Sequence, residues 1–150
     1  MFKKTIKYSI AALALSLFMV TSASAMPVEQ DPTEPGNNSY ITSYWFSQNV
    51  FPSFIQYSSD LDFWNFVAPK TVINQDIWLI PPYGKSYTFA IYEYGSGTPI
   101  AHARAYGYPT VIHANLQQGK QYTVLVYSTD GSYDVDIPYY LLFPDLFPYN

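Results

Sequence analysis

Two nine-residue segments of this chain repeat one pattern, and that pattern constrains the fold. Residues 84–92 read Gly-Lys-Ser-Tyr-Thr-Phe-Ala-Ile-Tyr, and residues 119–127 read Gly-Lys-Gln-Tyr-Thr-Val-Leu-Val-Tyr. After each Gly-Lys pair, large apolar residues recur at every second position, which is typical of a strand with one buried face. The residues predicted to face the core are Tyr87, Phe89, Ile91, Tyr122, Val124 and Val126. Since two copies are too few for a solenoid, the repeat predicts two equivalent strands.

The rest of the chain also favours strands and turns over helices. It contains 16 Tyr and 12 Pro, and only 12% of its residues are charged, a composition suited to sheets. The further strands are predicted at residues 62–67, 75–80, 100–105, 110–115 and 132–137. The last of these is expected to return antiparallel after a hairpin turn at Asp130-Gly131. Residues 40–56 fit either a strand or one helical turn. The sequence therefore predicts an all-β fold, an antiparallel β-sandwich.

The first 25 residues have the pattern of a secretory signal peptide. Lys3, Lys4 and Lys7 precede an apolar run at residues 10–20, and Ala-Ser-Ala at residues 23–25 fits a cleavage site. A retained membrane anchor is the alternative, but the run is shorter than the roughly 20 residues that a spanning helix needs. We therefore expect a secreted, extracellular protein that begins at Met26 and has no membrane anchor.

Charge and cysteine content exclude several classes of function. The chain has 11 acidic and 7 basic residues, and removal of the three signal-peptide lysines makes it more acidic still. Nucleic-acid binding is not expected, because phosphate backbones are bound mainly by Lys and Arg. There is no cysteine, so disulfides, thiol catalysis and a lipid-modified cysteine are excluded. About 125 residues after the signal peptide make one domain, which we expect to be monomeric.

Oxygen-bearing side chains suggest a cation site. Asp60 and Asp62 precede an aromatic strand, and Glu34, Asn37 and Asn38 lie upstream. Calcium prefers six to eight hard oxygen ligands from such residues. Asp60 and Asp62 lie on the same side of a strand, about 6.6 Å apart by strand rise. The alternative is that the two acids simply begin a strand and that Glu34 lies in a solvated tail.

Four segments, in this order and spacing, resemble the bacterial pre-peptidase C-terminal domain family, which includes the collagen-binding domains of secreted collagenases. They are residues 34–39 (Glu-Pro-Gly-Asn-Asn-Ser), residues 60–66 (Asp-Leu-Asp-Phe-Trp-Asn-Phe), the strand after Gly84-Lys85, and residues 116–137. The resemblance implies a jelly-roll-like sandwich, often calcium-bound, that serves in substrate binding or stability. We therefore expect a signal peptide (1–25), an N-terminal linker (26–39), the sandwich (40–137) and a C-terminal extension rich in Pro and aromatic residues (138–150), which continues past the last strand that the family predicts.

Exposed tyrosines are the main indication of a ligand. Tyr92 and Tyr127 are expected at the outward ends of the repeated strands, and Tyr106 and Tyr108 flank Gly107 in a loop. These four residues could hold an extracellular peptide or glycan polymer, because tyrosine offers a large contact area at low entropic cost. The sequence thus predicts a non-catalytic, calcium-stabilised binding module.

The aromatic residues after Ile137 leave a second interpretation open. They either pack back on the domain as an extra edge strand or dock on a partner, as in a secreted inhibitor or a matrix component. A small hydrolase is a third interpretation. It has little support because the chain lacks a G-x-S-x-G motif, and neighbouring acids on one strand seldom flank a substrate.

Overall fold

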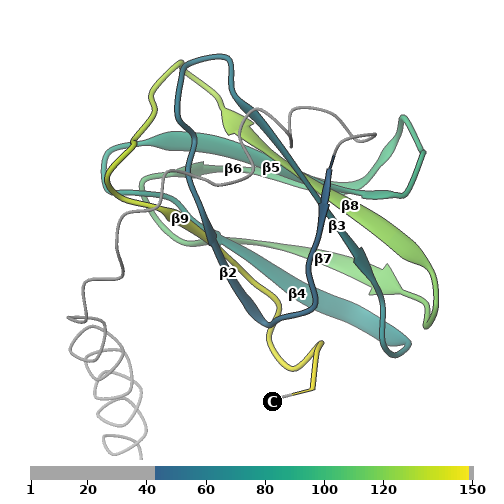
Figure 1. The fold of residues 1–150 in the computed structure, drawn as a ribbon. Helices are drawn as coiled ribbons and strands as arrows, with labels where there is room; N and C mark the ends of the chain where they lie inside the picture. The colour runs from purple at the N-terminus through teal and green to yellow at the C-terminus, as the bar shows by residue number, and fades with distance from the viewer. Residues whose placement is uncertain (1–42, 149–150) are drawn as a thin grey trace, which may run out of the picture.

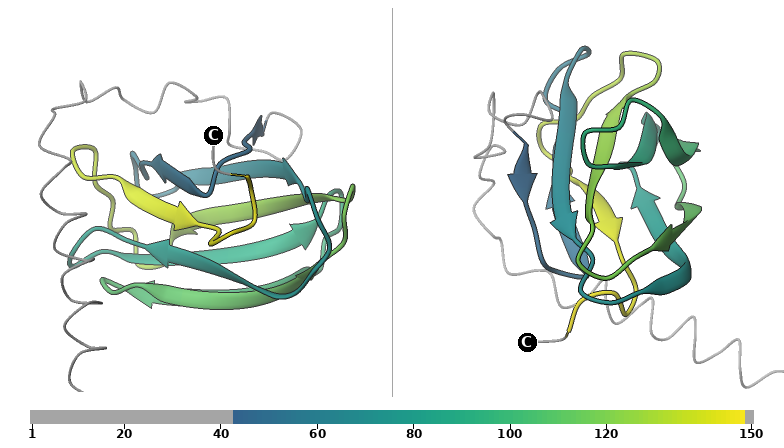
Figure 2. Two further views of the ribbon diagram at one scale, coloured as in Figure 1. Left: turned by 90° about the horizontal axis from the view of Figure 1, so that it is seen from below. Right: turned by 90° about the vertical axis from the view of Figure 1, so that its right-hand side faces the viewer.

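The computed structural model describes residues 43–148, which form nine strands in two facing sheets (Figures 1 and 2). The strands are β1 (Tyr44–Trp45), β2 (Val50–Ser53), β3 (Leu61–Val67), β4 (Val72–Ile80), β5 (Ser86–Glu93), β6 (Pro99–Tyr106), β7 (Thr110–Leu116), β8 (Gln121–Ser128) and β9 (Tyr139–Leu142). Every strand pairing is antiparallel except the short contact of β1 with β3. The predicted all-β sandwich is confirmed. No helix long and apolar enough to cross a membrane occurs among these residues.

The two repeated segments form neighbouring strands at the centre of the larger sheet. Its order is β1-β3-β8-β5-β6, and that of the smaller sheet is β2-β9-β4-β7. Phe89 of β5 lies opposite Val126 of β8. All six residues that the alternation assigned to the core are at most 2% exposed, so the predicted inward face is confirmed. The stretch at residues 40–56 forms strands β1 and β2 within its described part.

Aromatic side chains fill much of the space between the sheets. Phe46, Phe66, Phe143 and Phe147 lie with ring centroids 5.1–6.2 Å apart. Their tilted and edge-on orientations are those that aromatic pairs prefer. Two of these rings come from the C-terminal segment, so that segment is part of the core.

The structure therefore corrects the C-terminal boundary at Ile137. β9 pairs with β2 on one side and with β4 on the other, so it is an interior strand and not the extra edge strand that was expected. Tyr139, Leu141 and Phe143 are fully buried. The alternation of apolar residues after Pro138 buries one face of the strand, and its backbone is satisfied on both edges. The sandwich thus continues through Phe147, whereas residues 1–42, including the signal peptide and the linker, lie outside the described residues.

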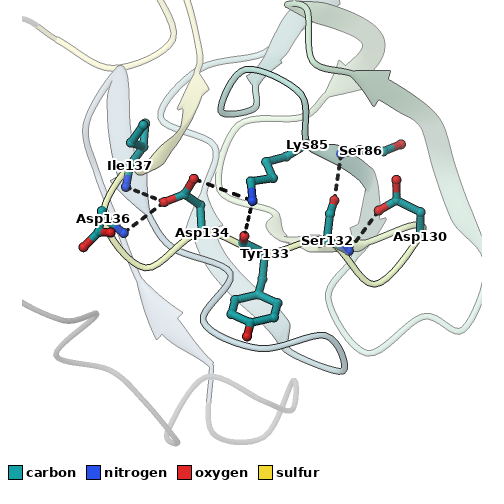
Figure 3. Close-up of polar contacts among 8 residues, drawn as sticks. All are labelled: Lys85, Ser86, Asp130, Ser132, Tyr133, Asp134, Asp136 and Ile137. Carbon is teal, nitrogen blue, oxygen red and sulfur yellow. Dashed lines mark hydrogen bonds and ion pairs between the residues drawn. The ribbon is translucent and has the colours of Figure 1, made fainter.

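Residues 132–137 are also corrected, because they form a loop and not a return strand (Figure 3). The Asp130 carboxylate accepts a hydrogen bond from the Ser132 backbone N–H at 2.9 Å. The Asp134 carboxylate accepts from the N–H groups of Asp136 at 3.0 Å and Ile137 at 2.9 Å. Such local bonds from Asp side chains compete with a strand ladder for the same backbone groups. The chain crosses to the other sheet here before β9 begins.

Candidate functional site

Asp60 and Asp62 lie inside the sandwich at the start of β3. Asp62 pairs with Val126, whose side chain is in the core, and it is 0% exposed, while Asp60 is 1% exposed. Carboxyl groups are costly to bury unless hydrogen bonds, opposite charges or a metal ion compensate. Neither acid is placed to touch a polymer or a substrate in solution.

Asp62 belongs to a hydrogen-bonded chain that links the two sheets. The Tyr139 hydroxyl donates to Asp62 Oδ2 at 2.5 Å and accepts from Trp64 Nε1 at 2.7 Å. Burial raises the pKa of Tyr139 well above its usual value, and the Asp62 carboxylate raises it further. The Tyr139 hydroxyl therefore keeps its proton and holds the Asp62 side chain in place at physiological pH.

Asp60 has one oxygen that is satisfied and one that is not. The backbone N–H of Gln56 donates to Asp60 Oδ2 at 2.7 Å, but the buried Oδ1 has no hydrogen-bond partner among the described residues. Gln56 Nε2, the Tyr87 hydroxyl and Ser128 Oγ share this property. Tyr87 and Ser128 lie opposite each other, at the end of the larger sheet where β3 begins. Buried polar atoms without partners among the described residues therefore lie together at this end of the sandwich, and each needs an explanation.

Several carboxylates near this region raise the pKa of Tyr87. Burial is the main cause that raises it, and the charges of Asp134, Asp62, Asp60 and Asp130 act in the same direction. The field at this end of the sandwich is negative, so a cation would be attracted to it.

A calcium ion fits the chemistry of this end, but the described residues do not complete a site. The free oxygen of Asp60 is a hard ligand of the kind that calcium prefers. Within residues 43–148, no group of three or more Asp, Glu, His or Cys residues is arranged to hold a metal. The other predicted ligands, Glu34, Asn37 and Asn38, lie outside the described residues. A site here would need oxygens from that segment, from backbone carbonyls or from water.

The loop after β8 is tied to the start of β5 by Lys85 (Figure 3). Lys85 Nζ donates to the Tyr133 carbonyl at 2.6 Å and lies 3.8 Å from Asp134 Oδ2. The backbone N–H of Ser86 donates to Ser132 Oγ at 3.2 Å. Hydrogen bonds with Ser132 lower the pKa of the exposed Asp130 carboxyl. Asp130 and Asp134 stabilise the loop through these hydrogen bonds, so their side chains have a structural role.

The predicted tyrosines fall into two groups. Tyr92 on β5 and Tyr127 on β8 point outward and are half-buried, and burial and the nearby Tyr127 raise the pKa of Tyr92. Tyr106 and Tyr108 are 60% and 69% exposed on either side of Gly107, whose φ of 70° favours glycine. All four have some surface open to solvent among the described residues.

Sequence reasoning missed Arg104. Its guanidinium lies 4.4 Å from the centroid of the Tyr106 ring, a cation–π geometry. Its Nε donates to Ser86 Oγ at 3.2 Å. The period-2 pattern of β6 would have placed Arg104 and Tyr106 on one face, because they are two residues apart. Tyr83, which is 88% exposed in the turn before β5, was also missed.

Comparisons with known proteins bear on the fold. Neither models of protein families nor the sequences of curated proteins match this chain. A solved structure does match, the pre-peptidase C-terminal domain of a collagenase from Bacillus anthracis. It aligns with a TM-score of 0.53 and 19% identity, over 67% of this chain and 91% of that domain. The chain has the fold of a pre-peptidase C-terminal domain.

The resemblance read from the sequence is thus confirmed at the level of the fold. A second solved structure is PliG of Aeromonas hydrophila, a periplasmic inhibitor of g-type lysozyme. It aligns with a TM-score of 0.44 and 13% identity, over 66% of this chain and 92% of that one. This similarity is too distant to support a conclusion about function.

Proposed function

We propose that this protein is a secreted, non-catalytic accessory module, stabilised by calcium, that binds an extracellular polymer or protein surface. The observation that supports calcium most directly is the buried Asp60 oxygen without a partner. It lies near several carboxylates that raise the pKa of Tyr87. A bound cation would offset the cost of burying Asp60 and Asp62.

The calcium ligands we propose are Asp60 and Asp62 together with Glu34, Asn37 and Asn38. The ion would be structural. It would join the segment before residue 43 to the start of β3, and its binding free energy would add to the stability of the folded state. The resemblance to a family whose members are often calcium-bound supports the same proposal.

The burial of Asp60 and Asp62 supports a role without catalysis. A pair of catalytic carboxylates must reach both sides of a substrate bond, whereas these two are at most 1% exposed. The similar fold of a domain from a collagenase, whose name describes it as a pre-peptidase C-terminal domain, also favours an accessory role. Contact with a polymer would use the outward tyrosines Tyr92, Tyr106, Tyr108 and Tyr127.

The alternative of partner docking through the C-terminal tail has no support from the structure. That hypothesis needs the aromatic residues after Ile137 to be exposed. Tyr140 is 38% exposed, but Tyr139, Leu141, Phe143 and Phe147 are at most 4% exposed. They stabilise their own domain, so they are not free to bind another protein.

The test of calcium is the thermal midpoint of the 26–150 protein in EDTA and in millimolar CaCl2. We expect calcium to raise the midpoint by several degrees, since ligand at about 100 times its Kd adds about 2.7 kcal/mol. Asp60→Asn should abolish this increase. Asp76→Asn is the matched control, because Asp76 is exposed and paired with His113. A midpoint that does not respond to calcium in the wild-type protein would exclude the ion from the function.

Two further measurements test secretion and binding. Mass spectrometry of the protein from culture medium should show Met26 as the first residue, and size-exclusion chromatography should show a monomer. Co-sedimentation with a panel of insoluble polymers, both glycans and fibrous proteins, should find at least one ligand. If none of them is bound, the proposed binding role is wrong.

A further inference from the structure

The outward surface of the larger sheet differs in charge from the rest of the protein. We define the outer face as the odd-numbered residues of 61–67 and 121–127 and the even-numbered residues of 86–92 and 100–106. They alternate with the core residues of β3, β8, β5 and β6. The chain has 11 acidic and 7 basic residues, yet no outer-face position is Asp or Glu, and two are His102 and Arg104.

Arg104 is the charged group of this face. Hydrogen bonds with Ser132 are the main cause that lowers the pKa of the exposed Asp130 carboxyl in the loop after β8, and the charge of Arg104 acts in the same direction. Within residues 43–148, the other cations contact oxygen atoms of their own chain. Lys85 lies by Asp134, Lys120 lies 3.2 Å from Glu93, and Lys70 donates to the Asp145 carbonyl. Arg104 instead lies over the Tyr106 ring and donates one N–H to Ser86 Oγ. It makes no ion pair with a described residue, so terminal N–H groups are available to an anionic ligand.

Strand register places the tyrosines around Arg104. Arg104 lies opposite Thr88 of β5, and Thr88 lies opposite Tyr127 of β8. Arg104 and Tyr127 are therefore two strands apart on one face, about 10 Å by the usual strand spacing. Tyr106 follows two residues after Arg104 on the same strand. Tyr106 and Tyr127 thus lie on the same face as a guanidinium that contacts the Tyr106 ring and Ser86.

We propose that the outer face binds an acidic polysaccharide, with Arg104 paired to the carboxylate of a uronate unit and Tyr106 and Tyr127 in contact with the sugar rings. This inference rests on the proposed function as a polymer-binding module and specifies its ligand. The planar guanidinium matches a carboxylate with two parallel hydrogen bonds. Because no outer-face residue is Asp or Glu, an anionic chain meets less repulsion here than elsewhere on an acidic protein.

The position of the surface favours a polysaccharide over an acidic peptide. An extended peptide gains much of its affinity from main-chain hydrogen bonds to a free strand edge. Arg104 and Tyr106 lie on the edge strand β6, whereas Thr88 and Tyr127 lie on β5 and β8, which are paired on both sides. A ligand that reaches from Arg104 to Tyr127 therefore crosses strands whose backbone groups are already used. A ligand across this face must be held by side chains, and sugar rings with hydroxyl and carboxylate groups suit tyrosine, threonine and arginine.

The test compares hyaluronate with its methyl ester, which keeps the sugar chain but removes the negative charge. Binding of the 26–150 protein is measured by isothermal titration calorimetry at low and high salt. We expect binding to hyaluronate that weakens with salt and at least tenfold weaker binding to the ester. Arg104→Ala should lose about tenfold in affinity, the cost of one charged hydrogen-bonded pair, and Arg104→Lys should retain part of it.

Lys120→Ala is the matched control, because Lys120 is a partly exposed cation that directly precedes β8, at the end of this strand away from Tyr127. It should bind like the wild-type protein, and all variants should keep the wild-type thermal midpoint. The inference is wrong if Arg104→Ala binds as tightly as the wild type, if the ester binds equally well, or if poly-glutamate binds and hyaluronate does not. Binding of a neutral polymer or a protein alone would overturn the inference and leave the proposed function standing.

Discussion

The buried hydrogen-bonded chain at the start of β3 can be tested by removing the hydroxyl oxygen of Tyr139. Removal of the hydroxyl oxygen of Tyr87 is the control. Both side chains are 0% exposed, and their ring centroids are 6.1 Å apart. The Tyr139 hydroxyl bonds to Asp62 and Trp64, whereas the Tyr87 hydroxyl has no partner among the described residues. Substitution of either tyrosine by phenylalanine removes one hydroxyl oxygen from a buried site. The two variants therefore differ in the hydrogen bonds that are lost.

The expected magnitudes follow from those partners. Tyr139→Phe leaves the buried Asp62 carboxyl with one donor fewer and the buried Trp64 indole N–H without its acceptor. Each lost bond costs about 1–3 kcal/mol, so the free energy of unfolding should fall by about 3 kcal/mol. For a domain of this size, that loss lowers the thermal midpoint by roughly 10–20 °C. Tyr87→Phe removes an unsatisfied buried hydroxyl and should be neutral or stabilising by up to about 1 kcal/mol.

The assay is thermal unfolding followed by circular dichroism, with urea unfolding to confirm the free energies. Both variants are measured in CaCl2 and in EDTA, so that the effect of the hydroxyl is separated from that of the ion. Equal losses of stability in the two variants would refute the reasoning. That result would mean that the hydrogen bonds of Tyr139 do not contribute more than the contacts of its ring.

Three further outcomes are expected. Stability should fall as the pH rises above about 10, because burial raises the pKa of Tyr87 and Tyr139 and the unfolded chain loses these protons first. Thermal midpoints between pH 8 and 11 measure this decline, and an unchanged midpoint would contradict it. Truncation after Ile137 should abolish cooperative unfolding, since it removes an interior strand. A folded truncated monomer would show that β9 is dispensable. Gly107→Ala should cost about 1–2 kcal/mol, because φ is 70° and a Cβ would lie 3.0 Å from the backbone N of Gly84. Gly97→Ala, which meets open space, should be nearly neutral, and equal effects would refute the strain.

Much of the larger sheet could be predicted because its pattern is local. β5 and β8 occupy the predicted residues, and their alternating apolar side chains face the core as expected. Alternation depends only on residues within one strand, so a single sequence is enough to detect it. The same alternation places Arg104 and Tyr106 on one face of β6, because the two residues are two positions apart.

The error at residues 132–137 arose from a local competition that alternation does not detect. The alternation predicts that Asp134 belongs to a strand. In the structure, its carboxylate accepts hydrogen bonds from the backbone N–H groups of Asp136 and Ile137. Those groups would otherwise donate to a neighbouring strand. Aspartate therefore stabilised a turn where the pattern alone predicted a strand.

By itself, the sequence determined the all-β class and the strands that repeat a pattern. Only the tertiary structure decided that β9 lies between β2 and β4, and that Asp62 and Tyr139, 77 residues apart, share a hydrogen bond. The reason is that alternation records which side of a strand is buried, whereas the choice of neighbouring strands depends on packing between residues far apart in the chain. The pairing of the strands buries Asp60 and Asp62. It also makes β9, which the sequence predicted to be an extension, an interior strand of the smaller sheet.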